Sequence, residues 1–413
     1  MKRVTIIGGG ITGLCSAYYL VKAGHEVTVI DKSTITDGAS FINAGYVTPS
    51  HFVPIAEPGM INQGIKWIFN NSSPFYIKPR WDMDFFKWSW YFKKSSTKNK
   101  VSKAIPVLKE LNEKSRDLYA EMLESFDFDF HMERKGLLMV YKSAKNEAHE
   151  AKLAEKGKDL GLDVSVLDKK ALHDLEPKFS EDVIGGVHYE CDAHSTPNLF
   201  MKNLKKWLTE HGVNFILEEA VTGLDVDNKT IKAVTTINKT IEADEFILAA
   251  GSWTFPLAKK LGLNIPIQPG KGYSMSISRE TDIHLPAILT EAKVAVTPMQ
   301  NFTRFAGTME FSGNNTTILP NRVEAIAKAA SNYYSGFTLT SEEKQSATSG
   351  LRPVSPDGLP FIGKSSKFKN LNVAAGHAMM GWSLGPITGK LISEIVDANH
   401  TSVLLEPFDL ERF

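Results

Sequence analysis

The chain has 413 residues, which is too long for one ordinary domain and predicts about two or three. Lysine plus arginine and aspartate plus glutamate number 47 each, so the formal net charge is zero. This balance excludes broad nucleic-acid binding, which needs a basic surface. The only cysteines, Cys15 and Cys191, lie far apart and favour reduced thiols over a disulfide framework or a metal site. With no signal peptide and no apolar stretch of about 18 residues, we expect a cytoplasmic protein without a spanning helix.

The first residues combine the pattern G-x-G-x-x-G with the elements that surround it in dinucleotide-binding proteins. An apolar strand, Val4–Ile7, precedes the glycines, a helix follows them, and Asp31 ends a second strand. The glycines are Gly8, Gly10 and Gly13. The first allows a tight turn, the second lets backbone approach a pyrophosphate, and the third lets helix and strand pack closely. The pattern predicts dinucleotide binding, with Asp31 accepting the ribose hydroxyls; the alternative is a glycine-rich turn in another α/β protein.

Residues 64–103 are rich in aromatic and basic side chains. They contain four of the seven tryptophans, namely Trp67, Trp81, Trp88 and Trp90, interleaved with phenylalanine, tyrosine and lysine. Aromatic rings with basic flanks suit peripheral contact with a membrane. The alternative is an aromatic lid over a substrate pocket with a solvated rim of lysines, and the sequence leaves both open.

Helices and strands then alternate along the chain. We expect helices at 101–125, 145–160 and 197–211, and strands at 136–141, 185–189, 213–217 and 245–251, with strand pairs through 221–241. The strand at 245–251 ends in Ala-Ala-Gly and predicts a second contact with the cofactor at Gly251. The sequence therefore predicts an α/β fold with two domains. A Rossmann-type cofactor domain is discontinuous, and an antiparallel-sheet substrate domain is inserted in it. The cofactor domain takes 1–48, 193–255 and 341–413, and the substrate domain takes 49–192 and 256–340.

The C-terminal region predicts a second ligand contact. A turn-rich segment, 349–360, holds one arginine, Arg352, whose guanidinium can bind a carboxylate through two hydrogen bonds. A strand at 371–375, a loop at 376–381 and a helix at 382–396 follow, which points a helix N-terminus at a ligand. His377 lies in that loop, where an active-site role and a structural role are both open.

These motifs make the chain similar to the flavin-dependent D-amino-acid oxidoreductase superfamily, which includes glycine oxidase and sarcosine oxidase. Within it the chain most resembles the bacterial D-amino-acid dehydrogenases, over nearly its whole length. The likeness rests on the glycine motif with Asp31, on 40–45 (SFINAG), on 56–59 with 65–67, on 270–274 (GKGYS), on 350–353 with 356–358, and on 376–377 with 381–382.

The resemblance implies FAD as the cofactor. It implies that Gly8, Gly10, Gly13, Asp31 and Lys32 hold the adenosine diphosphate part, that backbone at Val221 contacts adenine, and that Ser40, Asn43, Ala44, Gly45, Gly376 and Gly381 approach the flavin. Arg352 matches the arginine that binds the substrate carboxylate. Asn43 stands where the histidine-linked relatives have histidine, and no cysteine lies near the C-terminal motifs. We therefore expect non-covalent FAD.

The expected reaction is oxidative deamination of a D-amino acid. The substrate Cα loses hydride to flavin N5, and the imine hydrolyses to a 2-oxo acid and ammonia. Tyr273 and His377 are candidates to hydrogen-bond the amine or carboxylate, and Lys271 either anchors its loop or promotes reaction with oxygen. Electrons pass to a quinone or carrier, with peripheral contact at the inner face of a membrane as one option. The alternatives are a glycine or sarcosine oxidase that uses oxygen, a D-proline or hydroxyproline dehydrogenase, a nicotinamide-dependent dehydrogenase, or a flavoprotein subunit of a larger complex.

Overall fold

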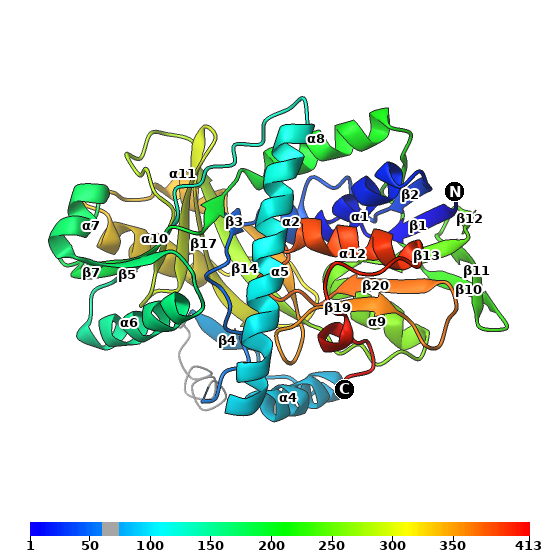
Figure 1. Cartoon of the computed structure of the whole chain (residues 1–413). Helices are drawn as coiled ribbons and strands as arrows, with labels where there is room; N and C mark the ends of the chain where they lie inside the picture. The colour runs from blue at the N-terminus through cyan, green and yellow to red at the C-terminus, as the bar shows by residue number, and fades with distance from the viewer. Residues whose placement is uncertain (60–73) are drawn as a thin grey trace.

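The computed structural model describes residues 1–59 and 74–413, in which two large sheets lie next to each other (Figure 1). The six-stranded sheet has the order β19-β20-β13-β1-β2-β9, and its strands are parallel except for β19. Its strands are β1 (Arg3–Ile7), β2 (Glu26–Ile30), β9 (Asn214–Ile216), β13 (Glu245–Leu248), β19 (Phe361–Lys364) and β20 (Leu371–Ala375). Helices or strands cover both faces of this sheet, which is why its central strands are almost continuously apolar.

Helices pack on one face of the six-stranded sheet and a small sheet packs on the other. The helical face carries α1 (Ile11–Lys22), α5 (Lys98–Ser125), α8 (Pro197–Glu210) and α12 (Gly385–Val396). The opposite face carries α9 (Thr254–Lys260) and the antiparallel strands β10 (Gly223–Asp227), β11 (Thr230–Thr235) and β12 (Thr240–Glu242). Neighbouring residues of one strand enter different cores: Ile6 packs with the helices, and Ile7 packs with the small sheet.

The second large sheet has nine strands, most of them antiparallel. Its order is β18-β14-β17-β16-β15-β5-β7-β6, and β4 also pairs with β17. The strands are β4 (Phe75–Ile77), β5 (Leu137–Tyr141), β6 (Val164–Asp168), β7 (Gly185–Tyr189), β14 (Gln268–Ile277), β15 (Ala287–Leu289), β16 (Val294–Met299), β17 (Phe302–Phe311) and β18 (Thr348–Val354). The helices around it are α4 (Met83–Ser95), α6 (Ala144–Asp159), α7 (Lys169–Leu175), α10 (Pro320–Tyr333) and α11 (Ser341–Gln345).

Short elements join the two large sheets. They are α2 (Gly38–Phe41), the strand pair β3 (Tyr46–Val47) and β8 (Ala193–His194), and the 3₁₀ turn η1 (Gly251–Trp253). A second 3₁₀ turn, η2 (Glu406–Phe408), packs beside β19 of the six-stranded sheet. In Figure 1 the long helix α5 runs from top to bottom across the front of the molecule, beside α12. Among residues 1–59 and 74–413, no helix is both long enough and apolar enough to cross a membrane.

The predicted fold class is confirmed, because a Rossmann-type parallel sheet and a second, mostly antiparallel sheet are both present. The six-stranded sheet draws its strands from 1–48, 193–255 and 341–413, whereas β18 from the last of these segments pairs with β14 in the nine-stranded sheet. The domain boundaries stay a prediction. The expected helix start at Trp382 is wrong: α12 begins at Gly385, with Pro386 in its first turn, where proline is favoured.

Candidate active site

A cavity of about 740 Å³ lies at the carboxyl edge of the parallel sheet. Its walls are the turns that follow β1, β2, β9, β13 and β20, together with the β18 segment from Thr348 to Pro353. The carboxyl ends of parallel strands meet at one edge, and ligands of open α/β sheets bind there. The cavity therefore joins residues that are far apart in the sequence.

The glycine turn after β1 leaves no room for side chains. Gly8 has φ +113°, and a Cβ there would lie 2.4 Å from the carbonyl oxygen of Ala249 on the neighbouring strand turn. A Cβ at Gly13 would lie 1.9 Å from the carbonyl oxygen of Gly8. Gly10 faces Ser40, whose Oγ accepts a hydrogen bond from the first N–H of α1, at Ile11, at 3.0 Å. The start of α1 is thus held directly against the cavity, as a phosphate-binding turn requires.

Asp31 stabilises the same turn from β2. Its carboxylate accepts hydrogen bonds from the N–H of Gly9 at 2.7 Å and from the N–H and Oγ of Ser33, both at 2.8 Å. Beside it, Lys32 Nζ lies 3.3 Å from the ring centroid of Trp253, and burial lowers the pKa of Lys32. Trp253 lines the cavity but has no sequence signal of its own, because a lone tryptophan after a strand is most often core packing.

The loop 40–45 is held in place by the nine-stranded sheet. Arg304 on β17 donates from Nη1 to the carbonyl oxygen of Asn43 at 2.7 Å, and Thr297 Oγ1 donates to that of Ala44 at 2.7 Å. The side-chain oxygen of Asn43 accepts from the N–H of Gly45 at 2.9 Å. Burial lowers the pKa of Arg304 to about 10. The segment 303–310 is one that the sequence suggests for the pocket, but nothing along the chain links Arg304 to this loop.

Arg352 presents a desolvated guanidinium at the edge of the cavity. Burial lowers its pKa to about 10, and no carboxylate among the described residues forms an ion pair with it. Its Nη1 donates to the carbonyl oxygen of Thr308 at 2.9 Å. Thr308 has φ +69° and lies in an irregularity of β17 opposite Lys271 to Tyr273. A cation held in this way, with donors left over, is suited to bind an anionic ligand.

Gly272 on β14 makes room for that guanidinium. A Cβ at Gly272 would lie 2.1 Å from Nη1 of Arg352. A side chain at position 272 would therefore displace the Arg352 guanidinium, whereas the backbone conformation of Gly272 does not itself call for glycine. The predicted motif at 270–274 contains this glycine, but the sequence does not show its partner.

Tyr273 is placed away from the cavity. Its hydroxyl donates to Glu310 Oε2 at 2.6 Å, and Lys271 Nζ forms an ion pair with Glu310 Oε1 at 3.1 Å. Lys271 also donates to the carbonyl oxygen of Thr317 at 2.7 Å, as expected for a residue that anchors its loop. Side chains alternate along a strand, so Lys271 and Tyr273 point away from Arg352, which lies over Gly272. Burial raises the pKa of Tyr273 well above its usual range, and Tyr273 is not among the described residues that line the cavity.

His377 lines the cavity, but its ring is bonded to the fold. Its Nε2 lies 2.9 Å from Thr388 Oγ1 on α12, and only 2% of the residue is exposed. Burial lowers the pKa of His377 to about 3. The ring is therefore neutral at physiological pH, and this geometry favours the structural role.

Replacing His377 with glutamine tests this role through the pH dependence of stability. In the unfolded chain His377 is protonated below about pH 6.5, whereas in the folded chain it stays neutral down to about pH 3. The free energy of unfolding of the wild type therefore decreases as the pH falls through this window, by up to about 1.4 kcal/mol per pH unit. We expect His377→Gln to show a shallower dependence in chemical denaturation between these pH values. Its kcat/KM should stay close to the wild-type value; a loss of about 100-fold or more would instead indicate acid–base catalysis.

The cavity brings together most of the predicted site residues. Those that line it are Gly8, Gly10, Asp31, Lys32, Ser40, Asn43, Val221, Gly251, Arg352, His377 and Gly381. Gly13, Ala44, Gly45 and Gly376 lie behind these residues and shape the turns. A Cβ at Gly45 would lie 2.2 Å from the carbonyl oxygen of Ser195, and one at Gly376 would lie 2.8 Å from the ring of Phe361. Sequence reasoning did not assign the lining residues Glu219, Ser252, Trp253, Ser349, Met379 and Trp382 to the site, although the last three lie in segments that it singled out.

The residues present fit FAD. The glycine turn and the start of α1 line the cavity where a pyrophosphate would lie, with the N–H groups of Gly9 and Ile11 bonded to Asp31 and Ser40. The cavity extends from the Asp31 turn to the loop 40–43 and Arg352. Residues 3–395 match the family of FAD dependent oxidoreductases called DAO. The chain belongs to this family.

Relatives within the DAO family match over their full length. D-amino acid dehydrogenase from Neisseria gonorrhoeae is 30% identical over 420 residues, covering 100% of this chain and 99% of the relative. D-amino acid dehydrogenase from Agrobacterium fabrum is 29% identical over 418 residues, covering 100% and 99%. The chain is therefore a DAO-family oxidoreductase along its whole length.

Solved structures of DAO-type flavoenzymes share the fold. Glycine oxidase from Geobacillus kaustophilus superposes with a TM-score of 0.79 at 21% identity, covering 100% of both chains. L-proline dehydrogenase from P. horikoshii has a TM-score of 0.77 at 18% identity, covering 100% of this chain and 97% of that one. L-alpha-glycerophosphate oxidase from Mycoplasma pneumoniae, with FAD bound, has a TM-score of 0.71 at 16% identity, covering 96% and 94%.

Proposed function

We propose that this chain catalyses the FAD-dependent oxidative deamination of D-amino acids. The observation that carries the proposal is the desolvated guanidinium of Arg352, which lies at the cavity edge without a carboxylate partner among the described residues. An amino acid brings the carboxylate that this cation lacks. The relatives that are named D-amino acid dehydrogenase support the D configuration.

In this proposal the protein mainly positions and desolvates the substrate. Arg352 binds the carboxylate, while Thr308 and Gly272 hold the guanidinium in one orientation. Bound FAD supplies the chemistry, accepting the hydride that leaves Cα. The nearby positive charge and the desolvated site both favour loss of a proton from the substrate ammonium to water, so that the neutral amine can donate electrons as the hydride leaves. No protein base is required, and His377, held neutral by burial, adds no charge. The imine then hydrolyses to a 2-oxo acid and ammonia.

Anaerobic mixing with candidate substrates tests the proposed function. The flavin absorbance of the holoenzyme should decrease with D-amino acids and stay unchanged with the L-enantiomers. Glycine, sarcosine and D-proline are included in the same series. Reduction by one of these alone would replace the D-amino-acid proposal by an oxidase of small amines or a cyclic imino acid dehydrogenase, and reduction by none would favour a flavoprotein subunit that needs partner chains.

We propose a quinone or an electron carrier as the electron acceptor, with peripheral contact at a membrane through the segment 64–103. Lys271 supports this choice over oxygen, because its ammonium is engaged by Glu310 and by the carbonyl oxygen of Thr317. Residues 64–73 of the segment, including Trp67, lie outside the described residues. Turnover with a soluble quinone and little hydrogen peroxide is the expected result, and stoichiometric peroxide would identify an oxidase.

We propose that FAD is held without a covalent bond. The side-chain oxygen of Asn43 accepts a hydrogen bond from the N–H of Gly45. Cys15 is buried in α1, and Cys191 is not among the described residues that line the cavity. Acid precipitation of the yellow protein should therefore release all flavin into the supernatant. Flavin absorbance that remains with the washed pellet would contradict this prediction.

A further inference from the structure

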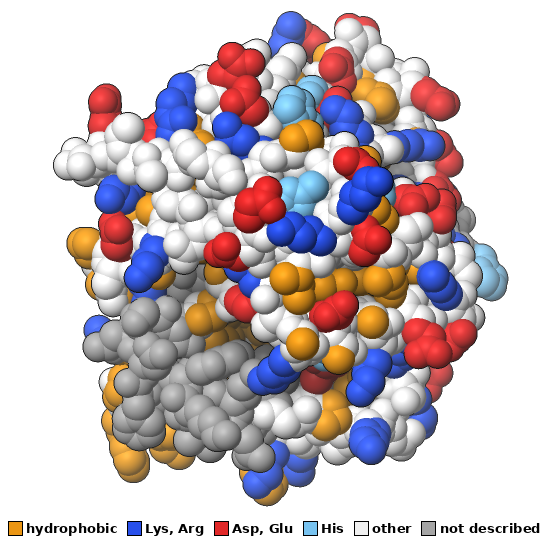
Figure 2. All heavy atoms as spheres, turned by 90° about the vertical axis from the view of Figure 1, so that its left-hand side faces the viewer, with side chains coloured by type: hydrophobic (Ala, Val, Ile, Leu, Met, Phe, Trp, Pro, Cys, Tyr) orange, Lys and Arg blue, Asp and Glu red, His pale blue; other side chains and the backbone are white. Residues whose placement is uncertain are grey.

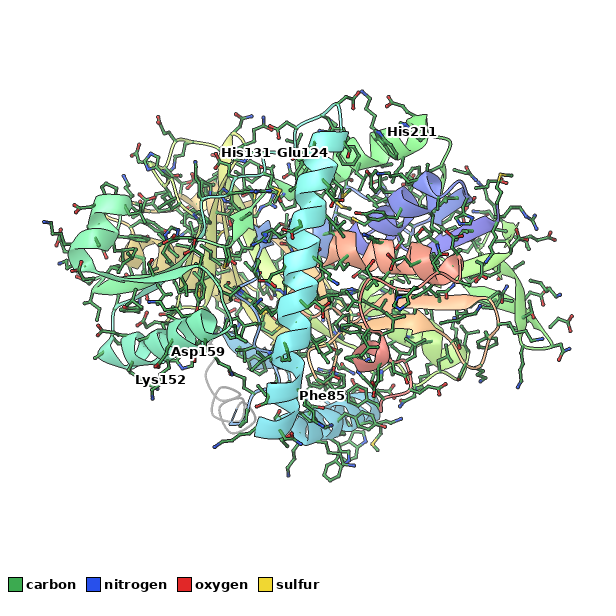
Figure 3. The ribbon with its side chains drawn as sticks, viewed as in Figure 1. Phe85, Glu124, His131, Lys152, Asp159 and His211 are labelled. Atoms are coloured by element: carbon green, nitrogen blue, oxygen red, sulfur yellow. The ribbon has the colours of Figure 1, made fainter. Side chains whose placement is uncertain are left out.

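The helix α4 has aromatic side chains on two opposite faces. Its inner face buries Phe85 and Trp88, which pack with Phe311 of β17. The indole Nε1 of Trp88 donates to the carbonyl oxygen of Val354 at 2.9 Å. Figure 3 labels Phe85 on this helix, at the lower end of the molecule. The inner face thus contacts the strand that carries Arg352, two residues before Val354.

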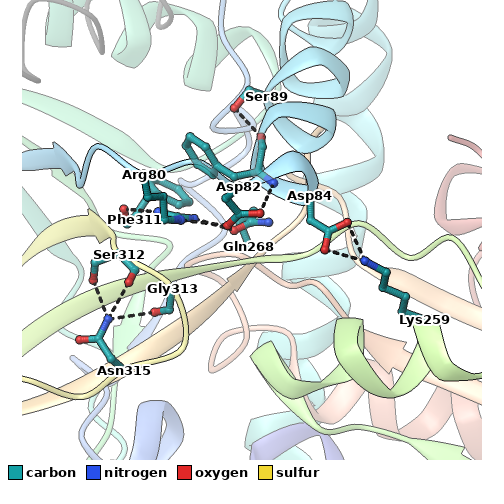
Figure 4. Close-up of polar contacts among 11 residues, drawn as sticks. Arg80, Asp82, Asp84, Ser89, Lys259, Gln268, Phe311, Ser312, Gly313 and Asn315 are labelled. Carbon is teal, nitrogen blue, oxygen red and sulfur yellow. Dashed lines mark hydrogen bonds and ion pairs between the residues drawn. The ribbon is translucent and has the colours of Figure 1, made fainter.

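Polar contacts fix the start of α4 to the body of the protein (Figure 4). Asp82 accepts a hydrogen bond from the N–H of Phe85 at 3.1 Å, which caps the helix, and its carboxylate pairs with Arg80 at 2.9 Å. Asp84 pairs with Lys259 of α9 at 2.8 Å. The helix is therefore anchored by its inner face and its first turn, and the direction of its outer face is set.

The outer face of α4, together with Trp81 just before the helix, exposes four large apolar side chains. Trp81 is 88% exposed, Met83 67%, Phe86 44% and Trp90 54%. Met83, Phe86 and Trp90 follow each other at three and four residues, the spacing of one side of a helix. The rings of Trp81 and Phe86 touch edge to face, with centroids 5.6 Å apart. Large apolar side chains exposed as one group indicate an interaction surface, whereas single ones do not.

Basic side chains border this group, and none of those on α4 forms an ion pair with a carboxylate of the described residues. Lys87, Lys93 and Lys94 of α4 are exposed, and Lys94 Nζ lies 5.1 Å from the ring centroid of Trp90. The first turns of α5 add further exposed lysines, namely Lys98, Lys100 and Lys103. Among the described residues, the nearby acidic side chains of Asp82 and Asp84 are paired with Arg80 and Lys259. In Figure 2, hydrophobic and basic side chains meet at the lower end of the molecule, the end at which α4 lies in Figure 1.

We infer that the outer face of α4 docks on a lipid bilayer that carries anionic headgroups. Tryptophan and phenylalanine enter the interface between water and acyl chains, and lysines beside them reach the phosphates. The lysines complement the negative headgroups. This inference rests on the proposed peripheral contact and narrows it from a segment to one helix face. The inner face of α4 also contacts β18, the strand that carries Arg352. In the docked protein, α4 would therefore lie between this strand and the membrane surface.

Flotation of the holoenzyme with liposomes tests the docking surface. We compare vesicles of phosphatidylcholine with and without phosphatidylglycerol, at low salt, and include a Trp81→Ser, Phe86→Ser, Trp90→Ser triple variant. The matched control is Ile237→Ser, which removes an 81% exposed apolar side chain on the turn between β11 and β12. We expect the triple variant to lose at least about tenfold in partitioning, and each of Lys93→Gln and Lys94→Gln to lose about fivefold on anionic vesicles. The control should float like the wild type.

The rates of flavin reduction by substrate and of electron transfer from the flavin to a soluble dye are measured on the same proteins. Both rates should be unchanged in all variants, so failure of docking and failure of the proposed function give different results. Equal flotation of triple variant and wild type would overturn the inference, as would a wild type that stays in the soluble fraction at low salt. Concentration-dependent self-association that is lost in the triple variant, without flotation, would instead assign the face to a second copy of the chain.

Discussion

Arg352→Ala is expected to lower kcat/KM by about 10²- to 10⁴-fold while FAD content stays at the wild-type level. Each hydrogen bond between a guanidinium and a carboxylate is worth about 1.5–3 kcal/mol, and a bidentate contact has two of them. The loss is large because Arg352 is desolvated and has no ion-pair partner among the described residues, so the substrate alone provides the opposite charge. Steady-state kinetics with the preferred amino acid, together with the flavin-to-protein absorbance ratio, measure both quantities.

Two further variants separate carboxylate binding from general damage. Arg279 lies just beyond the end of β14, is half exposed and forms an ion pair with Glu343. Arg279→Ala should leave kcat/KM unchanged. Gly272→Ala keeps Arg352 but places a Cβ 2.1 Å from its Nη1, so kcat/KM should fall while the flavin stays bound. Normal kcat/KM in Arg352→Ala with a full complement of FAD would refute the assignment of the substrate carboxylate to this residue.

Gly13→Ala is expected to produce protein that is purified without flavin. The added Cβ would lie 1.9 Å from the carbonyl oxygen of Gly8, so α1 must move away from β1, and overpacking of this kind costs about 1–3 kcal/mol. The same movement takes the first N–H groups of α1 away from the phosphates that they are placed to bind. The dissociation constant of FAD, measured by quenching of flavin fluorescence, should rise by at least about tenfold.

Gly157→Ala is the matched control for that substitution. Gly157 lies inside α6, and its added Cβ would meet its nearest neighbours at 3.5 Å, an ordinary contact. Alanine is also the better helix former by about 0.5–1 kcal/mol, so this variant should keep both its flavin and its melting temperature or gain slightly in stability. A Gly13→Ala protein that retains flavin as firmly as the control would contradict the proposed close contact of α1 with the glycine turn.

The cofactor region was predictable because its signals are local. The strand Val4–Ile7, the three glycines and Asp31 lie within one stretch of chain, and each glycine is required by a turn or contact formed by near neighbours or the adjacent strand. The proposed role of Arg352 in binding the substrate carboxylate rests on the resemblance and on its desolvated guanidinium. By contrast, the contact of Arg304 with the loop at Asn43 could not be found, because it joins residues more than 250 positions apart.

The sequence by itself determined the cofactor class and the two-part α/β fold, because hydrophobic periodicity and turn-forming residues act over short distances. Only the tertiary structure decided which way each side chain points. It placed Tyr273 on Glu310 instead of the cavity, held His377 neutral against Thr388, and divided the aromatic residues of α4 between an inner and an outer face. The physical reason is that burial, and with it charge state and access to ligand, depends on which distant strand or helix packs against a residue.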